Sequence, residues 1–221
     1  MSPSDVALLT AALMGLGYLC GACLGAVWLC RLAGVGDPRL RGSRNPGFSN
    51  VLRVHGKRLA LATLAFDAAK GVPVLWLAKS SDLPSWAQGL VGLGVLLGHS
   101  YPLWHRFRGG KSVASAFGVL LILTPPVALV CAACWALLAW RVRTAAVASL
   151  ASAALAPLVS VWLARDYVWV IIAFAALVLV RHVWNIQRLG QGTEPDFRKR
   201  SLNERSLDER RKSAGIRPPE E

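Results

Sequence analysis

Short polar side chains and glycines gather in three segments of an otherwise apolar chain. The segments cover residues 42–50 (GSRNPGFSN), 107–112 (FRGGKS) and 185–190 (NIQRLG). Backbone N–H groups in glycine-containing turns can form a concave anion-binding surface, and neighbouring arginine or lysine side chains add positive charge. The chemistry that these residue types support is the binding of phosphate groups.

The first segment combines flexible backbone with short donors. Gly42 and Gly47 permit backbone conformations that residues with a Cβ atom resist. Its short polar side chains are those of Ser43, Asn45, Ser49 and Asn50. Arg53 lies about one helical turn beyond Asn50 and can bind a phosphate through two parallel hydrogen bonds. The same composition is also typical of an ordinary surface turn.

The second segment contains Gly110-Lys111-Ser112, which resembles the end of the nucleotide-binding pattern G-x-x-x-x-G-K-[ST]. The first glycine of that pattern is replaced by His105, and an apolar segment precedes it in place of a buried strand. Nucleoside triphosphate binding is therefore rejected. Gly109 and Gly110 allow close backbone approach, Lys111 offers a cation, and Ser112 is placed to cap the next helix, whose N-terminus favours anions.

The third segment follows the last apolar stretch. His182, Asn185 and Arg188 are spaced by three residues, so they share one face if the segment is helical. Such a stripe either lines a site or caps a helix at the membrane surface. Because three such polar segments occur in one chain, a binding site is the favoured interpretation.

The stretches that connect these segments are apolar. Hydrophobic residues make up 54% of the 221 residues, and the mean hydropathy is +0.45, which exceeds the values of ordinary soluble domains. The sequence predicts an all-α, polytopic transmembrane helix bundle with about seven spans, near residues 6–30, 59–78, 85–98, 113–123, 125–140, 145–164 and 167–180. The third and fourth are short, so five or six spans remain an alternative.

Charge predicts the orientation of the spans, because short loops rich in lysine and arginine stay in the cytoplasm. Of the 25 lysine and arginine residues, 22 lie in alternate connections and in the tail, Lys79 and Arg165 fall in the opposite loops, and Lys70 lies within the second span. The N-terminus is expected outside and all three polar segments inside. Arg31 is the first basic residue and follows the first apolar run, so we expect that run to be retained as a span.

Composition also excludes some functions. The net charge of +13 is explained by topology, and the chain carries no nucleic-acid-binding signature, so no nucleic-acid partner is expected. Two CxxC pairs, Cys20 with Cys23 and Cys131 with Cys134, lie inside apolar spans, where packing is a better explanation than metal binding. We expect no metal and no cofactor.

Two further patterns concern packing inside the membrane. Glycines spaced by four residues occur in the first span, at positions 17, 21 and 25, and in the third, at positions 94 and 98. Such grooves let helices approach closely, without indicating which helix each one meets. Asp67 and Lys70 lie at helical spacing in the second span, where ionisable groups are costly and are expected to pair.

Taken together, the three segments resemble the acyl-phosphate-dependent glycerol-3-phosphate acyltransferase family, bacterial membrane enzymes that begin phospholipid synthesis. The family patterns are G-S-G-N-x-G-x-T-N-x-x-R, G-H-x-x-P-x-x-x-x-F-x-G-G-K-G-V-A and H-x-x-N-I-x-R-L-x-x-G-x-E. The counterparts include Gly42, Ser43, Asn45, Gly47, Asn50 and Arg53, then Gly98, His99, Pro102, Phe107, Gly109, Gly110 and Lys111, then His182, Asn185, Ile186, Arg188, Leu189, Gly192 and Glu194. The departures are Arg44 and Ser112 in place of glycine, Phe48 in place of a small residue, and Ser49 and Ser115 in place of threonine.

The resemblance implies acyl transfer from an acyl phosphate to the 1-hydroxyl of glycerol 3-phosphate, with lysophosphatidate and phosphate as products. It implies a catalytic role for Ser43, Lys111 and Asn185. It implies substrate or phosphate binding by Asn45, Gly47, Asn50, Arg53, His99, Gly109, Gly110, Ser149, His182, Arg188 and Glu194. No histidine is followed five positions later by an aspartate, and in the resembled family a substrate phosphate acts as the base.

The expected organisation is a transmembrane acyltransferase domain over residues 1–197 and a charged, flexible cytoplasmic tail over residues 198–221. The expected location is the bacterial plasma membrane, with membrane lipids as neighbours and with functional coupling to a soluble enzyme that makes acyl phosphate. Two alternatives stay open, namely a non-enzymatic anion carrier and a divergent paralogue with altered activity.

Overall fold

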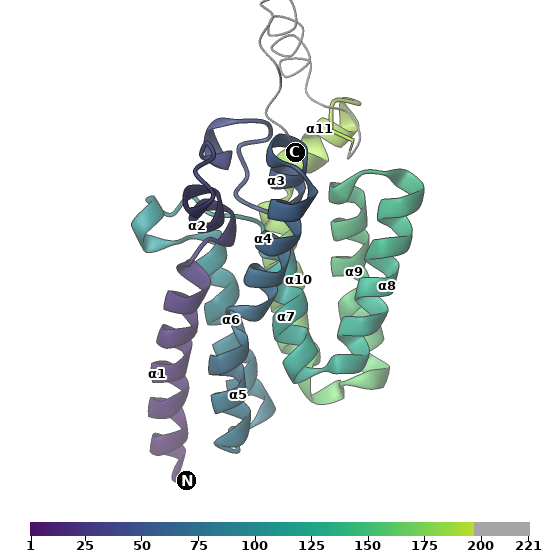
Figure 1. The fold of residues 1–221 in the computed structure, drawn as a ribbon. Coiled ribbons are helices and arrows are strands. Elements are labelled where there is room, and N and C mark those ends of the chain that lie inside the picture. Colours follow the sequence, from purple (N-terminus) through teal and green to yellow (C-terminus); the bar gives the residue numbers. More distant parts are fainter. Residues whose placement is uncertain (197–221) are drawn as a thin grey trace, which may run out of the picture.

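The structure is a computed structural model that describes residues 1–196, and every regular element in that part is a helix (Figure 1). The helices are α1 (Pro3–Ala22), α2 (Gly25–Leu32), α3 (Phe48–His55), α4 (Lys57–Ala69), α5 (Val72–Ser80), α6 (Ser85–Ser100), α7 (Val113–Leu123), α8 (Pro125–Val142), α9 (Ala145–Leu163), α10 (Val168–Arg181) and α11 (Val183–Gly190). Short 3-10 helices are η1 (Pro38–Leu40), η2 (Leu103–His105) and η3 (Arg165–Tyr167). The predicted all-α class is confirmed, and the predicted tail lies outside the described residues.

Each of the seven predicted apolar stretches contains a helix, but not all of these helices are of membrane-spanning length. Within residues 1–196, α1, the combined Lys57–Ser80 helix, α8 and α9 are long and apolar enough to cross a membrane. A fifth crossing results if α10 and α11, which are bent by 55°, form one span. The multi-pass architecture is therefore supported, while the count of seven stays a prediction.

The first predicted span is divided. It was expected as one helix over residues 6–30, whereas α1 ends at Ala22 and α2 begins at Gly25. The residues between the two helices, Cys23 and Leu24, have extended backbone. A buried carboxylate explains the break, because Asp67 Oδ1 of α4 accepts a hydrogen bond from the amide of Gly25 at 3.2 Å, where α2 begins.

The two glycine grooves face each other. A Cβ atom on Gly21 of α1 would collide with the carbonyl oxygen of Val95 in α6, and one on Gly98 of α6 with the carbonyl oxygen of Tyr18 in α1. The backbones therefore approach within van der Waals distance, as small residues at helix interfaces permit. This contact identifies the partners of Gly17, Gly21, Gly94 and Gly98, which the spacing alone left open, whereas Gly25 in α2 packs against Phe66 of α4.

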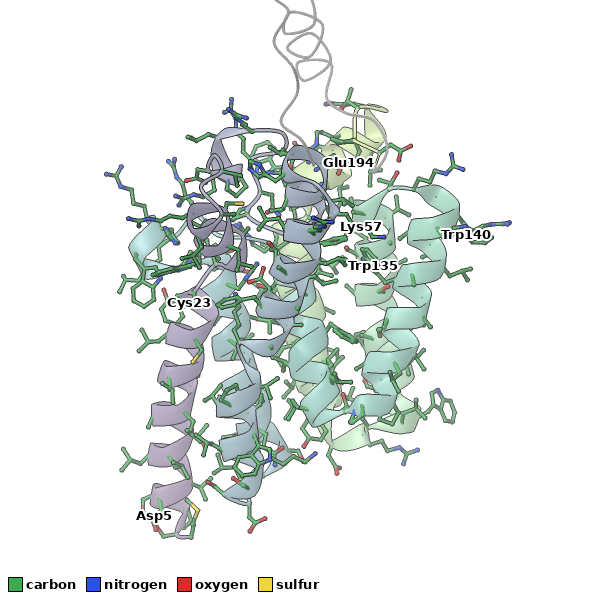
Figure 2. All side chains as sticks on the ribbon, viewed as in Figure 1. Asp5, Cys23, Lys57, Trp135, Trp140 and Glu194 are labelled. Carbon is green, nitrogen blue, oxygen red and sulfur yellow. The ribbon has the colours of Figure 1, made fainter. Side chains whose placement is uncertain are left out.

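All three polar segments lie at one end of the bundle. Figure 1 shows α2, α3 and α11 at the end opposite the N-terminus, and Figure 2 shows Glu194 and Lys57 there, with Asp5 at the other end. The main apolar core lies below them and includes Leu75, Val91, Leu96, Val119 and Ile171. The bundle thus presents the polar segments together on one surface.

Candidate active site

A cavity of about 330 Å³ opens beneath the three polar segments and continues between α7, α8, α9 and α10. All the predicted site residues except Gly109, Gly110 and Arg188 line it. Ser43, Lys111 and Asn185, which are far apart in the sequence, therefore border one space. Their chemical roles stay predictions.

Asn50 shapes the first segment. Its side chain is fully buried, and its Oδ1 accepts a hydrogen bond from the amide of Ser43 at 2.9 Å. Its Nδ2 donates to the carbonyl oxygens of Pro38 at 2.7 Å and Arg41 at 3.1 Å. Because its amide group is engaged inside the loop, Asn50 holds Ser43 at the cavity wall.

Gly42 supports the same loop from behind Ser43, and Arg53 completes the cavity wall. Gly42 has a φ of +58°, and a Cβ there would meet Oδ1 of Asn50, so the loop requires a glycine at this position. Arg53 extends from α3 and donates from Nη2 to Oγ of Ser43 at 3.2 Å. A hydroxyl and a guanidinium group thus lie together on the surface of the cavity.

Gly109 and Gly110 pack against α6 and are not part of the cavity wall. Their amides donate to the carbonyl oxygens of Ser100 at 3.2 Å and His99 at 2.9 Å. A Cβ on Gly110 would collide with Nε2 of His99. The glycines therefore allow the loop to lie directly on His99, and this position brings the next residue, Lys111, to the cavity.

Arg181 at the end of α10 fixes the same loop from the other side. Its Nε donates to the carbonyl oxygen of Gly110 and its Nη2 to that of Gly109, each at 3.0 Å. Its guanidinium group also lies over the ring of Tyr101, 4.9 Å from the ring centre. The site residues predicted from the sequence did not include Arg181, although it directly precedes His182.

Lys111 is the cation that the second segment presents to the cavity. Burial lowers the pKa of its ammonium group to about 8, and the positive charges of Arg188, Arg53 and Arg181 act in the same direction. The carboxylate of Glu194 opposes this shift. A phosphate bound in the cavity would place a negative charge near the ammonium group and so favour its charged form.

Ser112 does not cap α7, contrary to the prediction. It precedes the helix with a φ of +59°, and its side chain makes no capping hydrogen bond. Its Oγ donates to the carbonyl oxygen of Leu96 and lies against Oγ of Ser100, each at 2.7 Å. The left-handed backbone directs the hydroxyl toward α6 and away from the first turn of α7.

Glu194 organises the third segment. Its Oε1 accepts a hydrogen bond from Nδ2 of Asn185 at 2.6 Å, and its Oε2 accepts one from Nε of Arg188 at 2.8 Å. Because Arg188 neutralises the carboxylate, Glu194 can lie in the cavity wall without strongly repelling an anion. Arg188 does not border the cavity and acts on it through Glu194, whereas Asn185 borders the cavity and is held there by Glu194.

His182 lies at the bend between α10 and α11 and is almost completely buried. Its Nδ1 is 2.8 Å from the carbonyl oxygen of Val178. A carbonyl oxygen can only accept, so Nδ1 carries the proton, and in the neutral ring Nε2 is an acceptor. His182 can therefore receive a hydrogen bond from a hydroxyl group in the cavity.

A buried ionic cluster supports the floor of the site. Lys70 Nζ is 3.0 Å from Asp67 Oδ1, so the predicted pair is confirmed. The same ammonium group donates to the carbonyl oxygen of Cys23 at 3.0 Å and to His99 Nδ1 at 2.7 Å. Since an ammonium group only donates, the proton of His99 lies on Nε2.

Ser149 and Ser152 line the cavity from α9. Oγ of Ser149 accepts a hydrogen bond from Nε1 of Trp135 at 3.0 Å, and Trp135 lies on the inner side of α8 whereas Trp140 points away from the bundle (Figure 2). Oγ of Ser152 is buried and has no hydrogen-bond partner among residues 1–196. Ser152 was not among the predicted site residues, although it lies one helical turn beyond Ser149 and so shares its face of the helix.

The deeper part of the cavity is apolar. Its wall includes Leu120 of α7, Ala128 of α8, Ala156 of α9, and Ile171 and Phe174 of α10. Ala156 lies seven residues beyond Ser149 in α9, a distance of about 10 Å along a helix axis. A ligand with a phosphate at one end and a hydrocarbon chain at the other matches this division. No group of His, Cys, Asp or Glu side chains within the described range could hold a metal ion.

Comparisons with known proteins agree on one family. Residues 11–192 match the model of the family described as glycerol-3-phosphate acyltransferase. A protein of that name from Chromohalobacter salexigens is 64% identical over 210 residues, which cover 95% of this chain and 96% of the relative. Another, from Albidiferax ferrireducens, is 41% identical over 201 residues, 86% of this chain and 90% of the relative.

Two solved structures have a similar fold. Both are of PlsY, an integral membrane glycerol 3-phosphate acyltransferase. The glycerol 3-phosphate form has a TM-score of 0.79 and 34% identity, and the lysophosphatidic acid form has a TM-score of 0.76 and 33% identity. Each comparison covers 85% of this chain and 94% of the other.

Proposed function

Because the chain belongs to the glycerol-3-phosphate acyltransferase family, we propose that it transfers an acyl group from an acyl phosphate to the 1-hydroxyl of glycerol 3-phosphate. The observation that carries the proposal is the position of Ser43, Lys111 and Asn185 around one cavity with an apolar extension. An acyl phosphate has the matching shape, with an anionic head and a hydrocarbon tail. Glycerol 3-phosphate is the ligand in one of the related PlsY structures.

In the proposed reaction, the 1-hydroxyl oxygen attacks the acyl carbon, the bond from that carbon to the phosphate oxygen breaks, and its electron pair leaves with phosphate. The hydroxyl proton passes to the departing phosphate. The products are lysophosphatidate and inorganic phosphate. Lys111 and Arg53 stabilise the negative charge on the leaving group, as fixed cations do in low-dielectric sites.

The two histidines have positioning roles in this proposal. Nδ1 of His99 accepts from Lys70, and His99 lies beneath Gly110, so we expect it to support the loop that carries Lys111. Nε2 of His182 is free to accept a hydrogen bond from a hydroxyl group of glycerol 3-phosphate. Neither histidine is paired with a carboxylate in the His-x-x-x-x-Asp manner, so the leaving phosphate is the proposed base.

The membrane arrangement is part of the proposal. We expect seven spans over residues 1–197, with the N-terminus outside and the site facing the cytoplasm of a bacterial plasma membrane. The concentration of lysine and arginine at the end that holds the cavity supports this orientation. A cytoplasmic site would receive acyl phosphate from a soluble enzyme that makes it.

The experiment is a comparison of acyl donors with purified protein in proteoliposomes. Acyl phosphate, acyl-CoA and an acyl carrier protein thioester are supplied separately with labelled glycerol 3-phosphate, and Lys111→Ala is the control. We expect lysophosphatidate from acyl phosphate alone, with Lys111→Ala nearly inactive. Product from thioesters alone would refute the donor, and movement of label across the bilayer without product would indicate a carrier.

A further inference from the structure

A second cavity lies on the other side of the Gly109–Gly110 loop. It is an open crevice of about 970 Å³ between the segment that follows α2 and the segment that follows α6. Arginine dominates its wall, with Arg39, Arg44, Arg106, Arg108 and Arg181. The two cavities share no lining residue, so the crevice is not an extension of the active site.

Most of the positive charge in the crevice is not neutralised. Asp37 is its one acidic lining residue and pairs with Arg39 at 2.7 Å. Arg181 binds the carbonyl oxygens of the glycine loop. The remaining three arginines, Arg44, Arg106 and Arg108, are exposed and form no ion pair within residues 1–196.

The backbone is strained at two of these arginines and at the phenylalanine between Arg106 and Arg108. Arg44, Arg106 and Phe107 have φ values of +59°, +52° and +58°, a region that glycine adopts freely and that side chains with a Cβ resist. All three residues border the crevice. Strained residues that persist in one place indicate a functional constraint on that place.

Apolar side chains on the crevice wall point to a lipid. Leu40, Trp104 and Phe107 are 77%, 50% and 55% exposed. Nε1 of Trp104 donates to the carbonyl oxygen of Ala22, the last residue of α1, at 3.0 Å. The crevice therefore lies at the level where the first membrane helix ends, and Figure 1 shows the segment after α6 projecting from the side of the bundle beside α2. Exposed tryptophan at such a level is typical of the membrane–water interface.

We propose that this arginine crevice binds the phosphate-bearing headgroup of an anionic phospholipid from the surrounding leaflet. Arginine forks bind the phosphate, because a guanidinium group matches phosphate geometry with two hydrogen bonds. Leu40, Trp104 and Phe107 contact the glycerol and upper acyl region of the same lipid. The proposal is independent of the acyl-transfer reaction, since it concerns a different cavity.

The test measures lipid retention by native mass spectrometry of the full-length protein in neutral detergent. Phosphatidylglycerol and phosphatidylcholine are titrated separately, and phosphatidylglycerol is titrated again in the presence of inorganic phosphate at concentrations from low to excess. The variants are Arg106→Gln/Arg108→Gln and Arg44→Gly, the second of which suits the positive φ and is not expected to impair folding. The matched control is Arg141→Gln/Arg143→Gln, which removes two exposed charges at the end of α8, outside the crevice.

We expect saturable retention of phosphatidylglycerol by the unmodified protein and by the control. Removal of two arginine charges should weaken it about 10- to 30-fold in Arg106→Gln/Arg108→Gln, and Arg44→Gly should weaken it about fivefold. Equal retention of phosphatidylcholine, an equal loss in the control, or unchanged binding in both crevice variants would overturn the proposal. Displacement of the lipid by low concentrations of inorganic phosphate would also overturn it, because the site would then recognise the free anion.

Discussion

Arg53 donates a hydrogen bond from Nη2 to Oγ of Ser43 across 3.2 Å. The same serine is held through its amide by Asn50, at 2.9 Å. Both Arg53 and Ser43 border the active-site cavity. Ser43 is therefore fixed from two sides next to a permanent positive charge, an arrangement that suits a group that contacts a substrate phosphate.

The pH dependence of the reaction should reflect Lys111. Burial lowers its pKa to about 8 in the free protein, so the cation is lost as pH rises through that value. We expect kcat/KM for acyl phosphate to fall above a pH of about 8, because kcat/KM reports the ionisation of the free enzyme. The substrate phosphates are already ionised there, since their second pKa is about 6.

The matched variant for this profile is Lys111→Arg, whose guanidinium group stays charged throughout the range. Its kcat/KM should be lower than that of the unmodified enzyme at pH 7 but flat from pH 7 to 9. A profile that falls equally in both proteins would mean that another group controls it. Glu194→Ala should move the fall to lower pH, because Glu194 raises the pKa of Lys111.

Glu194 and Asn185 should act as one unit. Glu194→Ala removes the acceptor that holds the side chain of Asn185 at 2.6 Å. We expect kcat/KM to fall about 10- to 100-fold, which corresponds to the free energy lost with one hydrogen bond to a charged group. Asn185→Ala should cause a similar loss. The double variant should resemble either single one in a double-mutant cycle of kcat/KM, and additive losses would contradict the arrangement.

The predicted helices follow the apolar pattern closely, because backbone polar groups in a bilayer must be hydrogen-bonded within the protein and a helix achieves this locally. The sequence predicted helices in all seven stretches, and the pairing of Asp67 with Lys70 follows from the cost of isolated charges in a membrane. The break after Ala22 was not predictable, since it depends on Asp67 of a different helix accepting from Gly25. Local sequence carries no signal for such a distant contact.

The motifs indicated which residues gather but not how each one acts. Substrate binding by Asn50, Gly109 and Gly110 stays a prediction, and the structure shows in addition that the side chain of Asn50 and the backbone of the two glycines make hydrogen bonds within the protein. Arg44 and Ser112, which replace glycines of the family pattern, both have a φ of +59°. Arg44 lines the arginine crevice and does not narrow the active-site cavity. The direction of its side chain depends on the left-handed backbone at this position, which the residue type alone does not reveal.

Replacing one member of the Asp67–Lys70 pair should destabilise the protein more than replacing both members. Lys70→Met leaves a buried carboxylate without its cation, and we expect a loss of about 3 to 5 kcal/mol of stability. Asp67→Asn/Lys70→Met keeps an oxygen for the Gly25 amide and should lose less. Thermal unfolding in detergent measures both, and a double variant less stable than Lys70→Met would show that the pair is not the main interaction.

The apolar end of the cavity should determine the preferred acyl chain. Ala156 is buried in α9 and lines this end, so Ala156→Leu fills space that the chain would occupy. We expect the preferred acyl phosphate to become shorter, with long-chain kcat/KM reduced about 10- to 100-fold relative to short-chain substrate. Leu158→Ala, at an exposed position of the same helix, is the control, and an equal loss for all chain lengths would argue against chain binding here.

The central claim is that three distant segments form one phosphate-binding active site. The most direct measurement is the rate of lysophosphatidate formation from acyl phosphate by Ser43→Ala, Lys111→Ala and Asn185→Ala, with folding checked by thermal unfolding. We predict that folded Ser43→Ala and Lys111→Ala each lose about 100-fold or more in kcat/KM, as expected for groups that stabilise transition-state charge, and that folded Asn185→Ala loses about 10- to 100-fold. Folded variants that retain the rate of the unmodified protein would contradict the claim.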